Sequence, residues 1–229
     1  MKSTAPDLLE HERSLVARGE VVVGVDEVGR GALAGPLTVG VVVVTSAAPA
    51  PRGLTDSKLL SPARRESLVA PIRGWAAAWS LGSVSASDID RWGLRLALAV
   101  AATRALDGLT LTPTFALLDG SFNLLDAPMP LDGEVNGVPP LRYATLRHAT
   151  LVKGDRKSAT IAAASVLAKV HRDAEMIRLH EGFEPYEWSQ NKGYGSARHM
   201  QVLRQRGPSM HHRRTWRLGI APGGVTGPE

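Results

Sequence analysis

Two adjacent carboxylates, Asp26 and Glu27, directly follow the apolar run Val21–Val25. Such a run predicts a strand that is buried on both faces. A carboxylate in that setting must be solvated, paired or bound to a cation, because its desolvation is costly. The alternative is that the strand has ended and both acids face water. Because side chains alternate along a strand, that alternative explains one carboxylate better than two.

Two further acids occupy comparable positions. Asp119 ends a second apolar run, Phe115–Leu118, and Asp155 precedes a long helical segment. For Asp155 taken alone, we favour a role as a helix cap. If neighbouring strand ends bring Asp26, Glu27 and Asp119 together, their repulsion requires a cation, and oxygen ligands favour a hard divalent ion such as Mg²⁺ or Mn²⁺. Carboxylates that hold two such ions are a known solution to phosphodiester hydrolysis.

A glycine-rich turn follows the first acidic pair. Gly29 and Gly31 flank Arg30, and glycines at these positions allow the main chain to present N–H groups to a ligand. The turn is not a nucleotide P-loop, because no Lys-Ser or Lys-Thr pair follows at the required spacing.

The distribution of charge indicates a polyanionic partner. The net charge is +5, yet no acidic residue occurs between Glu187 and Glu229. The basic side chains of this segment are typical of a phosphate-binding footprint, with a solvated basic tail as the alternative. Together with the histidines among them, they are Lys192, Arg198, His199, Arg204, Arg206, His211, His212, Arg213, Arg214 and Arg217.

Composition excludes several classes of protein. The 229 residues include no cysteine, which excludes a disulfide scaffold, a thiol nucleophile and thiolate metal sites. A hydrophobic content of 44% with 21% charged residues is that of a globular chain. No uncharged apolar stretch is long enough to span a bilayer, and the charged residues between Asp7 and Arg13 do not fit a signal peptide. We therefore expect a cytoplasmic protein with no membrane partner.

The segments that would position these residues alternate between strand and helix. Strands are predicted at 21–25, 37–45, 75–84, 115–118 and 150–153, and helices at 7–18, 61–72, 87–105, 160–180 and 196–205. A hairpin turn is predicted at Asp132-Gly133. This order predicts an α/β or mixed α+β domain with helices packed on a central sheet.

Small side chains mark one face of the helix that begins near Thr160. Ala162, Ala163, Ala164 and Ala168 would let this helix approach the sheet closely. We interpret these residues as structural and assign no catalytic role to Ser165 among them.

Six motifs follow one another from about Val21 to about Arg214: DEVGRG, GALAGPLTVGVVV, TDSKLLSPARRE, LLDG, KGDRKSATIAAASVLAKVHRD and NKGYGS. In this order they resemble bacterial ribonuclease HII. The resemblance implies a ribonuclease-H-like fold, with a central mixed sheet, flanking helices and a helical, basic C-terminal extension. It divides the chain into an N-terminal helical segment (residues 1–20), a catalytic domain (21–182) and a substrate-binding extension (183–229) of the same unit.

The resemblance also implies an activity and a metal site. The family cleaves the phosphodiester on the 5′ side of a ribonucleotide, in RNA–DNA hybrids or at single ribonucleotides in duplex DNA, and leaves a 3′-hydroxyl and a 5′-phosphate. This activity serves ribonucleotide removal in DNA repair and replication. The family's acidic tetrad corresponds to Asp26, Glu27, Asp119 and Asp155, which would bind Mn²⁺ or Mg²⁺ in a two-metal mechanism.

Substrate contacts are implied in the same way. The turn Gly29–Gly31, including Arg30, would read the ribose 2′-hydroxyl, the group that distinguishes RNA from DNA. Tyr194 would stack on the sugar that follows the ribonucleotide, and Lys58 and Lys153 would lie near the substrate backbone. We expect a monomer, while the choice between the two metals and a DNA clamp as partner stay open.

Three features depart from the family pattern. Val28 replaces the alanine of the usual DEAGRG, and Asn191-Lys192 stands where the family often has His-Lys. The interval from Asp119 to Asp155 is about twice that expected of the family, with the excess between about 126 and 142. Because an insertion in a surface loop costs little stability, the acidic residues can still come together.

Other functions fit less well. The related ribonuclease HIII carries an extra N-terminal domain, whereas only about twenty residues precede the first predicted strand. A non-catalytic hybrid-binding protein with a decayed site is disfavoured by the presence of all four acids. A phosphatase or an integrase-like nuclease would have different motifs around its carboxylates, although the fold alone does not exclude either.

Overall fold

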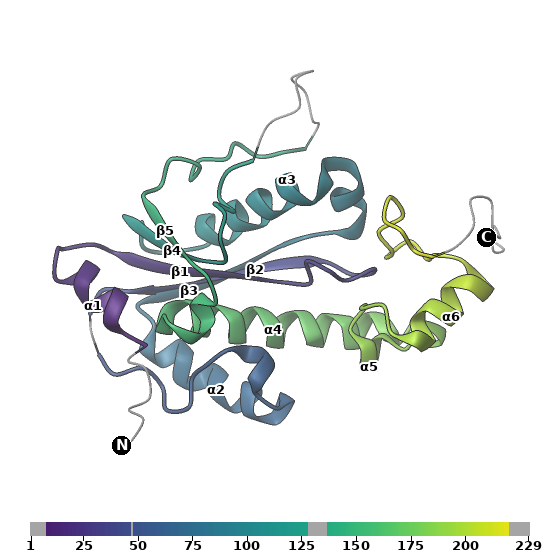
Figure 1. Cartoon of the computed structure of the whole chain (residues 1–229), viewed down its shortest axis with the longest axis horizontal. Coiled ribbons are helices and arrows are strands. Elements are labelled where there is room, and N and C mark those ends of the chain that lie inside the picture. Colours follow the sequence, from purple (N-terminus) through teal and green to yellow (C-terminus); the bar gives the residue numbers. More distant parts are fainter. Residues whose placement is uncertain (1–7, 47, 128–136, 220–229) are drawn as a thin grey trace.

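The computed structural model describes residues 8–46, 48–127 and 137–219. These residues form a five-stranded sheet in the order β3-β2-β1-β4-β5, which crosses the middle of the molecule in Figure 1. The pairs β1–β2 and β2–β3 are antiparallel, whereas β1–β4 and β4–β5 are parallel. The sheet is therefore mixed, as the resemblance implies. Its strands are β1 (Val22–Val28), β2 (Leu37–Val44), β3 (Ala78–Val84), β4 (Phe115–Asp119) and β5 (His148–Leu151).

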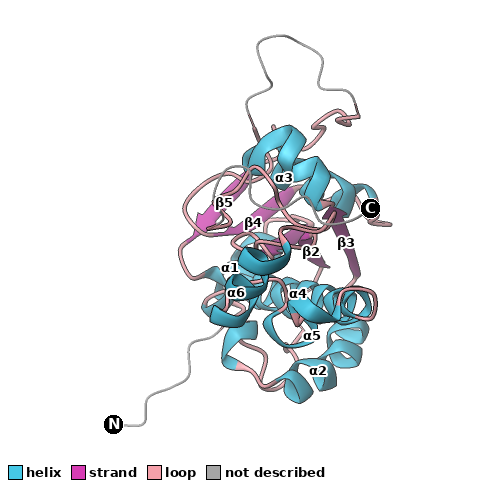
Figure 2. Cartoon of the chain, turned by 90° about the vertical axis from the view of Figure 1, so that its right-hand side faces the viewer, coloured by secondary structure: helices cyan, strands magenta, loops and turns pink. Residues whose placement is uncertain are grey.

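Helices cover both faces of the sheet. Figure 1 shows α3 (Ala86–Asp107) on one face and α4 (Ala159–His180) on the other. In Figure 2, turned by 90°, the strands lie between α3 and the pair formed by α4 and α2 (Pro62–Trp75). The other described helices are α1 (Glu10–Val16), α5 (Trp188–Asn191) and α6 (Ala197–Arg206), with 3₁₀ turns at Ser57–Leu59, Gly154–Arg156 and Glu184–Tyr186. No described helix is long and apolar enough to cross a membrane.

Two glycines of the sheet allow α4 to lie unusually close to it. A Cβ atom on Gly24 of β1 would lie 2.3 Å from the carbonyl carbon of Thr160, and one on Gly40 of β2 would lie 2.5 Å from the carbonyl oxygen of Ala164. Neither position therefore tolerates a side chain. The small residues of α4 serve the close packing that the sequence predicts.

Serine side chains begin four of the helices, because each accepts a hydrogen bond from the main-chain N–H three residues later. These residues are Ser61, Ser85, Ser158 and Ser196. The predicted role of Asp155 as a helix cap was therefore wrong. Ser158 occupies the capping position of α4, and Asp155 lies within the preceding 3₁₀ turn.

Three predicted boundaries shift for local reasons. The third strand begins at Ala78 rather than at Trp75, because Trp75 still belongs to α2. The last strand ends at Leu151. Lys153 adopts a left-handed conformation with φ 58°, which interrupts the extended backbone of a strand. The first helix is shorter than predicted, and Gly19 with φ 81° follows it.

Within the long connection between β4 and β5, the structure describes residues 120–127 and 137–147. Its second end packs beside α3, where the hydroxyl of Tyr143 donates to Asp107 Oδ1 at 3.1 Å. The predicted hairpin turn at Asp132-Gly133 lies outside the described residues.

The C-terminal segment folds back onto the loop that follows β1. His212 forms a β-bridge with Ala34, and the N–H of Arg213 donates to Leu33 O at 2.9 Å. The carboxylate of Asp90, at the start of α3, accepts from the N–H of Arg214 at 2.7 Å. Residues far apart in sequence thus form one structure at the right of Figure 1.

Candidate active site

Parallel pairing of β1 and β4 places two predicted acids side by side. Val25 pairs with Leu118, so Asp26 and Asp119 follow at the same level of adjacent strands. Asp155 joins them from the 3₁₀ turn after β5. One carboxylate oxygen from each of Asp26, Asp119 and Asp155 lies within 4.8 Å of the others. Three convergent carboxylate oxygens fit a hard divalent cation.

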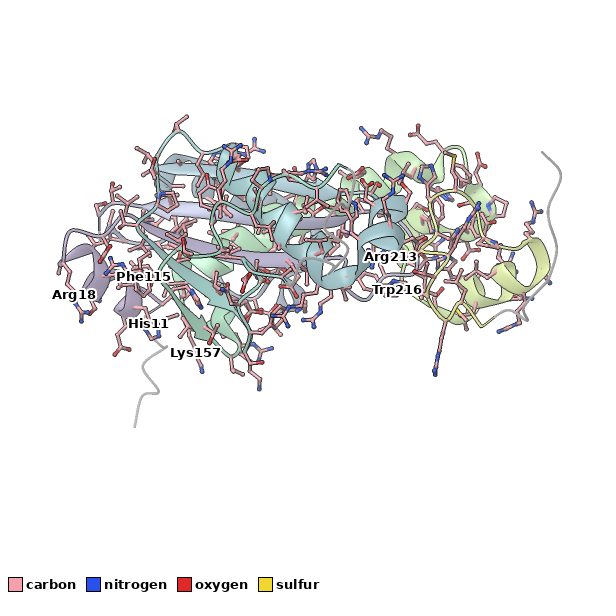
Figure 3. The ribbon with its side chains drawn as sticks, turned by 90° about the horizontal axis from the view of Figure 1, so that it is seen from above. His11, Arg18, Phe115, Lys157, Arg213 and Trp216 are labelled. Atoms are coloured by element: carbon pink, nitrogen blue, oxygen red, sulfur yellow. The ribbon has the colours of Figure 1, made fainter. Side chains whose placement is uncertain are left out.

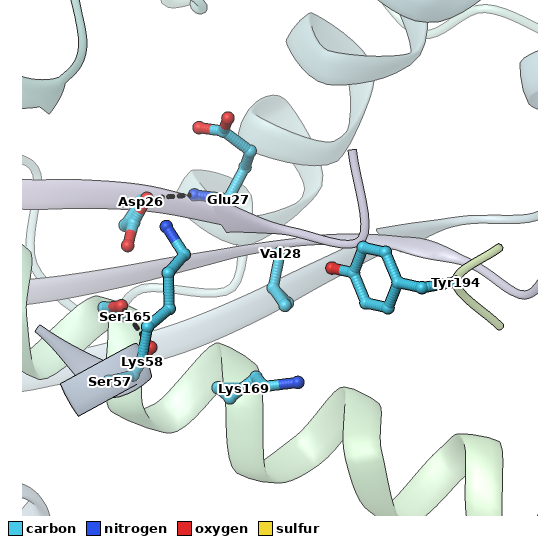
Figure 4. A pocket seen from close by; sticks show the side chains of 8 residues that line it. All are labelled: Asp26, Glu27, Val28, Ser57, Lys58, Ser165, Lys169 and Tyr194. Atoms are coloured by element: carbon cyan, nitrogen blue, oxygen red, sulfur yellow. Dashed lines mark hydrogen bonds between the residues drawn. The ribbon is translucent and has the colours of Figure 1, made fainter. Parts of the chain in front are cut away.

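Glu27 stands apart from this group of three. It points away from Asp26, toward the opposite side of β1, as Figure 4 shows, in keeping with the alternation of side chains along a strand. Its Oε1 lies 3.6 Å from Arg30 Nη1. Burial raises the pKa of Glu27, although Arg30 acts in the opposite direction. Both acids nevertheless line the same pocket, of about 320 Å³.

The electrostatics of the cluster also fit a bound cation. Burial raises the pKa of Asp26 well above its usual value, and the charges of Glu27 and Asp119 add to the rise. The pKa of Asp155 is raised to about 6, first by burial and then by Asp56 and Asp119. These shifts report an excess of negative charge in a poorly solvated place, which a divalent cation would relieve.

Lys58 supplies a positive charge beside the acids. Its side chain reaches across the pocket toward Asp26 in Figure 4. Burial lowers its pKa, but Asp26, Asp56, Asp155 and Asp119 together outweigh that effect and raise it. The ammonium group is therefore held charged at the mouth of the acidic cluster.

A fifth acid, Asp56, lies beside the cluster and was not predicted as a site residue. The residue is buried, and its Oδ2 lies 3.0 Å from Arg156 Nη2. Its Oδ1 accepts from the N–H of Lys58 at 2.8 Å, which fixes the turn that carries this lysine. The only signal in the sequence was its place in the same Asp-Ser-Lys motif as Lys58.

Four other pocket residues were not predicted as site residues: Val28, Ser57, Ser165 and Lys169. Ser165, which we interpreted as structural, lines the pocket on α4, and its hydroxyl lies 2.8 Å from that of Ser57. Lys169 lies one turn further along α4 and pairs with Asp173 at 2.7 Å. Spacing along α4 places Ser165 and Lys169 on one face, four residues apart, which is the signal that could have indicated both.

Tyr194 lines the other end of the pocket and is 38% exposed. Lys153 differs, because its side chain is exposed and does not line this pocket. Its left-handed backbone instead turns the next N–H, that of Gly154, onto Asp119 Oδ1 at 2.7 Å. In the structure Lys153 thus orients a carboxylate through its main chain.

The basic segment after Glu187 contains buried, half-buried and exposed side chains, with Lys192 and His211 half-buried. Arg213, His199 and His212 are buried, so the expectation that they face phosphates was wrong for these three. Exposed side chains of the segment remain available for that role: Arg198, Arg204, Arg206, Arg214 and Arg217.

The two buried histidines form a hydrogen-bonded chain that ends at Tyr194. Ser209 N–H donates to His212 Nδ1 at 2.9 Å, which leaves the proton of the neutral ring on Nε2. That Nε2 lies 3.0 Å from His199 Nε2, and His199 Nδ1 lies 2.9 Å from Tyr194 O. Burial lowers the pKa of both histidines, to about 3 for His212. Burial thus disfavours the charged form of both rings, and their hydrogen bonds fix the main chain of Tyr194.

Known proteins share this arrangement of sequence and fold. A family model described as Ribonuclease HII matches residues 23–218. A ribonuclease HII of Streptomyces griseus is 43% identical over 210 residues, which cover 90% of this chain and 81% of that protein. Ribonuclease H2 of Pyrococcus horikoshii OT3 has a TM-score of 0.65 at 28% identity, with 86% of this chain and 94% of that chain covered.

A second solved structure is the RNase HII of Archaeoglobus fulgidus in a complex with PCNA. It has a TM-score of 0.64 at 28% identity, with 86% of this chain and 95% of that chain covered. These likenesses confirm the ribonuclease-H-like fold that the motifs imply. With a family match over most of its length, the chain belongs to the ribonuclease HII family and is a ribonuclease H, an endonuclease that cleaves RNA in RNA–DNA hybrids.

Proposed function

We propose that the enzyme cuts on the 5′ side of ribonucleotides, both in RNA–DNA hybrids and at single ribonucleotides in duplex DNA, and leaves a 3′-hydroxyl and a 5′-phosphate. One observation carries the proposal: Asp26 and Tyr194 line opposite ends of one pocket. An acidic cluster suited to phosphodiester cleavage thus lies beside an exposed aromatic ring that is suited to stacking on a sugar. This placement favours an enzyme that tests the nucleotide next to the bond it cuts.

The acidic residues are proposed to form the metal site. Ribonucleases H depend on divalent metal, and here Asp26, Asp119 and Asp155 would hold the ions, with Glu27 as a further ligand. When bound, such ions supply Lewis-acid activation of the attacking water and stabilisation of the leaving oxygen, as in two-metal hydrolysis. Both Mn²⁺ and Mg²⁺ suit an all-oxygen donor set.

The residues around this site are proposed to select the substrate. The exposed residues Arg30 and Gly31 would meet the ribose 2′-hydroxyl through their N–H groups. Tyr194 would stack on the adjoining sugar. The charged ammonium of Lys58 would neutralise the phosphate that faces the acids. Lys153 would contact the substrate backbone further out, since its side chain is exposed.

The wider setting follows from this chemistry. Residues 183–229 would hold the duplex through their exposed arginines, residues 21–182 would carry out the reaction, and residues 1–20 would support them. We propose a monomeric, cytoplasmic enzyme that removes ribonucleotides from DNA. The Archaeoglobus fulgidus protein is seen in a complex with PCNA, and binding experiments with a DNA clamp would test for such a partner here.

Cleavage of end-labelled duplexes tests the proposal. We would compare a DNA duplex with one ribonucleotide, the same duplex without it, and an RNA–DNA hybrid, each with Mg²⁺, Mn²⁺ or chelator. A single metal-dependent cut on the 5′ side of the ribonucleotide is expected. Cleavage of the continuous hybrid alone would remove the single-ribonucleotide activity from the proposal. Tight binding without cleavage in either metal would favour a binding protein instead.

A further inference from the structure

The guanidinium of Arg213 is fully buried, yet among the described residues it donates only to main-chain carbonyls. Its Nη2 lies 2.6 Å from Gly29 O and 3.3 Å from Gly35 O, and its Nη1 lies 2.9 Å from Arg30 O. The indole ring of Trp216 lies 4.8 Å from the guanidinium carbon, and Figure 3 shows the pair where the C-terminal segment meets α3. Burial is also the main cause that lowers the pKa of Arg213, to about 10. A buried cation without a carboxylate is costly, so the contacts it makes must matter to the fold or to the site.

Two of these contacts fix the direction of the peptide groups in the glycine-rich turn. In a trans peptide the C=O and the following N–H point in opposite directions. The carbonyls of Gly29 and Arg30 belong to the peptide groups whose N–H groups are those of Arg30 and Gly31. Since both carbonyls face Arg213, both N–H groups face away from it. No described residue accepts a hydrogen bond from either N–H, and both residues are exposed.

A second buried arginine supports the same loop from α4. Arg172 donates from Nε to Pro36 O at 2.8 Å and from Nη1 to Lys192 O at 2.9 Å. Its guanidinium carbon lies 5.5 Å from the centre of the Tyr194 ring. A Cβ atom on Gly29 would lie 2.2 Å from Arg172 Nε, so this glycine is required by packing as well as by its φ of 86°. The loop between β1 and β2, which contains the turn, is thus held from two sides by cations.

We propose that Arg213 is a positioning residue for substrate recognition, which holds the N–H groups of Arg30 and Gly31 outward as a pair of donors for the ribose 2′-oxygen. A cation bonded to the carbonyl end of each peptide group polarises it and strengthens its N–H as a donor. This inference rests on the proposed role of the turn in reading the ribonucleotide and deepens it. A phosphate oxygen could use the same donors, and the experiment separates these two sources.

The test compares Arg213→Lys with the wild type. Lysine keeps the positive charge but lacks the planar fork that reaches several carbonyls at once. Binding is measured with chelator present, which prevents cleavage, on two duplexes that differ only in one 2′-hydroxyl. We expect the preference for the ribonucleotide to fall on the order of tenfold, the effect of one lost hydrogen bond to a polarised donor. Amide hydrogen exchange in the peptide that covers residues 28–35 should rise as well.

The matched control is Arg178→Lys, the same exchange at a side chain that is 74% exposed. It should change neither the preference nor the exchange rate. Preference and exchange that stay at wild-type values in folded Arg213→Lys would overturn the proposal. An equal loss of affinity for both duplexes would overturn it in favour of a phosphate contact.

Two further measurements keep the inference separate from folding and from the proposed function. If Arg213→Lys does not fold, the guanidinium proton resonances of wild-type Arg213 are followed by NMR. They should shift more with the ribonucleotide duplex than with the all-DNA duplex, and identical shifts would refute the inference. Gly31→Ala tests the turn itself: unchanged preference there removes the proposed reading of the 2′-hydroxyl. If the preference for the ribonucleotide falls in Gly31→Ala but not in Arg213→Lys, only the proposed role of Arg213 is refuted.

Discussion

The carboxylate of Glu12 lies against the N-terminus of α4, where its Oε1 accepts hydrogen bonds from both the N–H and the hydroxyl of Thr160 at 2.9 Å. The same oxygen accepts from the hydroxyl of Ser158 at 2.6 Å. A residue of the N-terminal helix thus completes the capping of the helix that closes one side of the active site. The contact is long-range in sequence, because 148 positions separate Glu12 from Thr160.

Glu12→Ala should destabilise the protein by about 2–3 kcal/mol, because it leaves several buried donors without an acceptor. Chemical denaturation measures the loss as a lower midpoint with an unchanged slope. Glu10→Ala, at an exposed position of the same helix, should change the free energy of unfolding by less than about 0.5 kcal/mol. Equal effects of the two substitutions would show that the buried contact contributes little.

Gly31→Ala should separate recognition from folding. A Cβ atom on Gly31 meets nothing within 4 Å, and the residue has no positive φ. We therefore expect stability within about 0.5 kcal/mol of the wild type, or slightly higher through a stiffer unfolded chain. Cleavage at a single ribonucleotide should fall by about tenfold or more, because the methyl group stands in the space that the ribose must approach.

Gly74→Ala is the control for that substitution. This glycine also has open space around its Cβ position but lies in α2, away from the pocket. It should leave cleavage unchanged and raise the free energy of unfolding by about 0.5–1 kcal/mol, the gain from glycine to alanine inside a helix. Full activity in Gly31→Ala would contradict the proposed contact between this residue and the ribose.

Asp26→Asn should have opposite effects on activity and on stability. Cleavage should fall by more than about 100-fold, a loss that even outer-shell changes bring to metal sites. Because burial and neighbouring acids raise the pKa of Asp26, the neutral amide should melt at a higher temperature than the wild type when no metal is present. Differential scanning calorimetry with chelator measures this directly.

The response of the same variant to metal gives an independent reading. Mg²⁺ or Mn²⁺ should raise the melting temperature of the wild type, since a ligand that binds the native state stabilises it. The rise should be smaller in Asp26→Asn. A variant that gained as much from metal as the wild type would place the ion elsewhere.

The buried histidines should make stability depend on pH. The pKa of His212 is lowered from 6.5 to about 3 in the folded state, first by burial and then by the neighbouring His199. The unfolded chain therefore binds the proton more readily, and stability is complete above about pH 6.5 and decreases as the pH falls toward 3. Between pH 7 and pH 5 the loss should be about 1–2 kcal/mol.

His212→Asn isolates this contribution. The raised pKa values of Asp26 and Asp155 act with the opposite sign, since those groups bind protons more readily in the folded state. The difference between wild type and variant, measured by urea denaturation at both pH values, removes that opposing effect. If both proteins lose the same free energy on acidification, His212 does not carry the dependence.

The site residues at the ends of strands could be predicted from the sequence. Asp26 and Asp119 each follow a continuous apolar run, so their place at the edge of the sheet depends only on local hydrophobicity and on parallel pairing. The mixed α/β class followed from the same runs. Asp155 was harder, because an acid before a helix usually caps it, and only the structure shows Ser158 in that role.

Residues brought in by tertiary packing could not be predicted in this way. Asp56 and Ser165 belong to a turn and a helix whose contact with each other depends on how α4 lies on the sheet. Arg213 carries the positive charge that is typical of a phosphate-binding residue. It is buried because its guanidinium donates to carbonyl groups 183 and 184 positions earlier in the chain. No hydrophobic periodicity in the sequence indicates such partners, so the charge of Arg213 led to the prediction that it is exposed.

The long sequence separation between Arg213 and Gly29 affects the order in which parts of the enzyme fold. A growing chain that has reached the end of α4 already contains every acid of the cluster, yet it lacks the guanidinium 184 positions from Gly29 that holds the glycine-rich turn. Contacts of such long range form after local ones, because a large loop must close first. During synthesis, then, the acidic cluster can assemble before the turn that is proposed to read the ribose. On that proposal, discrimination between ribose and deoxyribose is the last property that the polypeptide acquires.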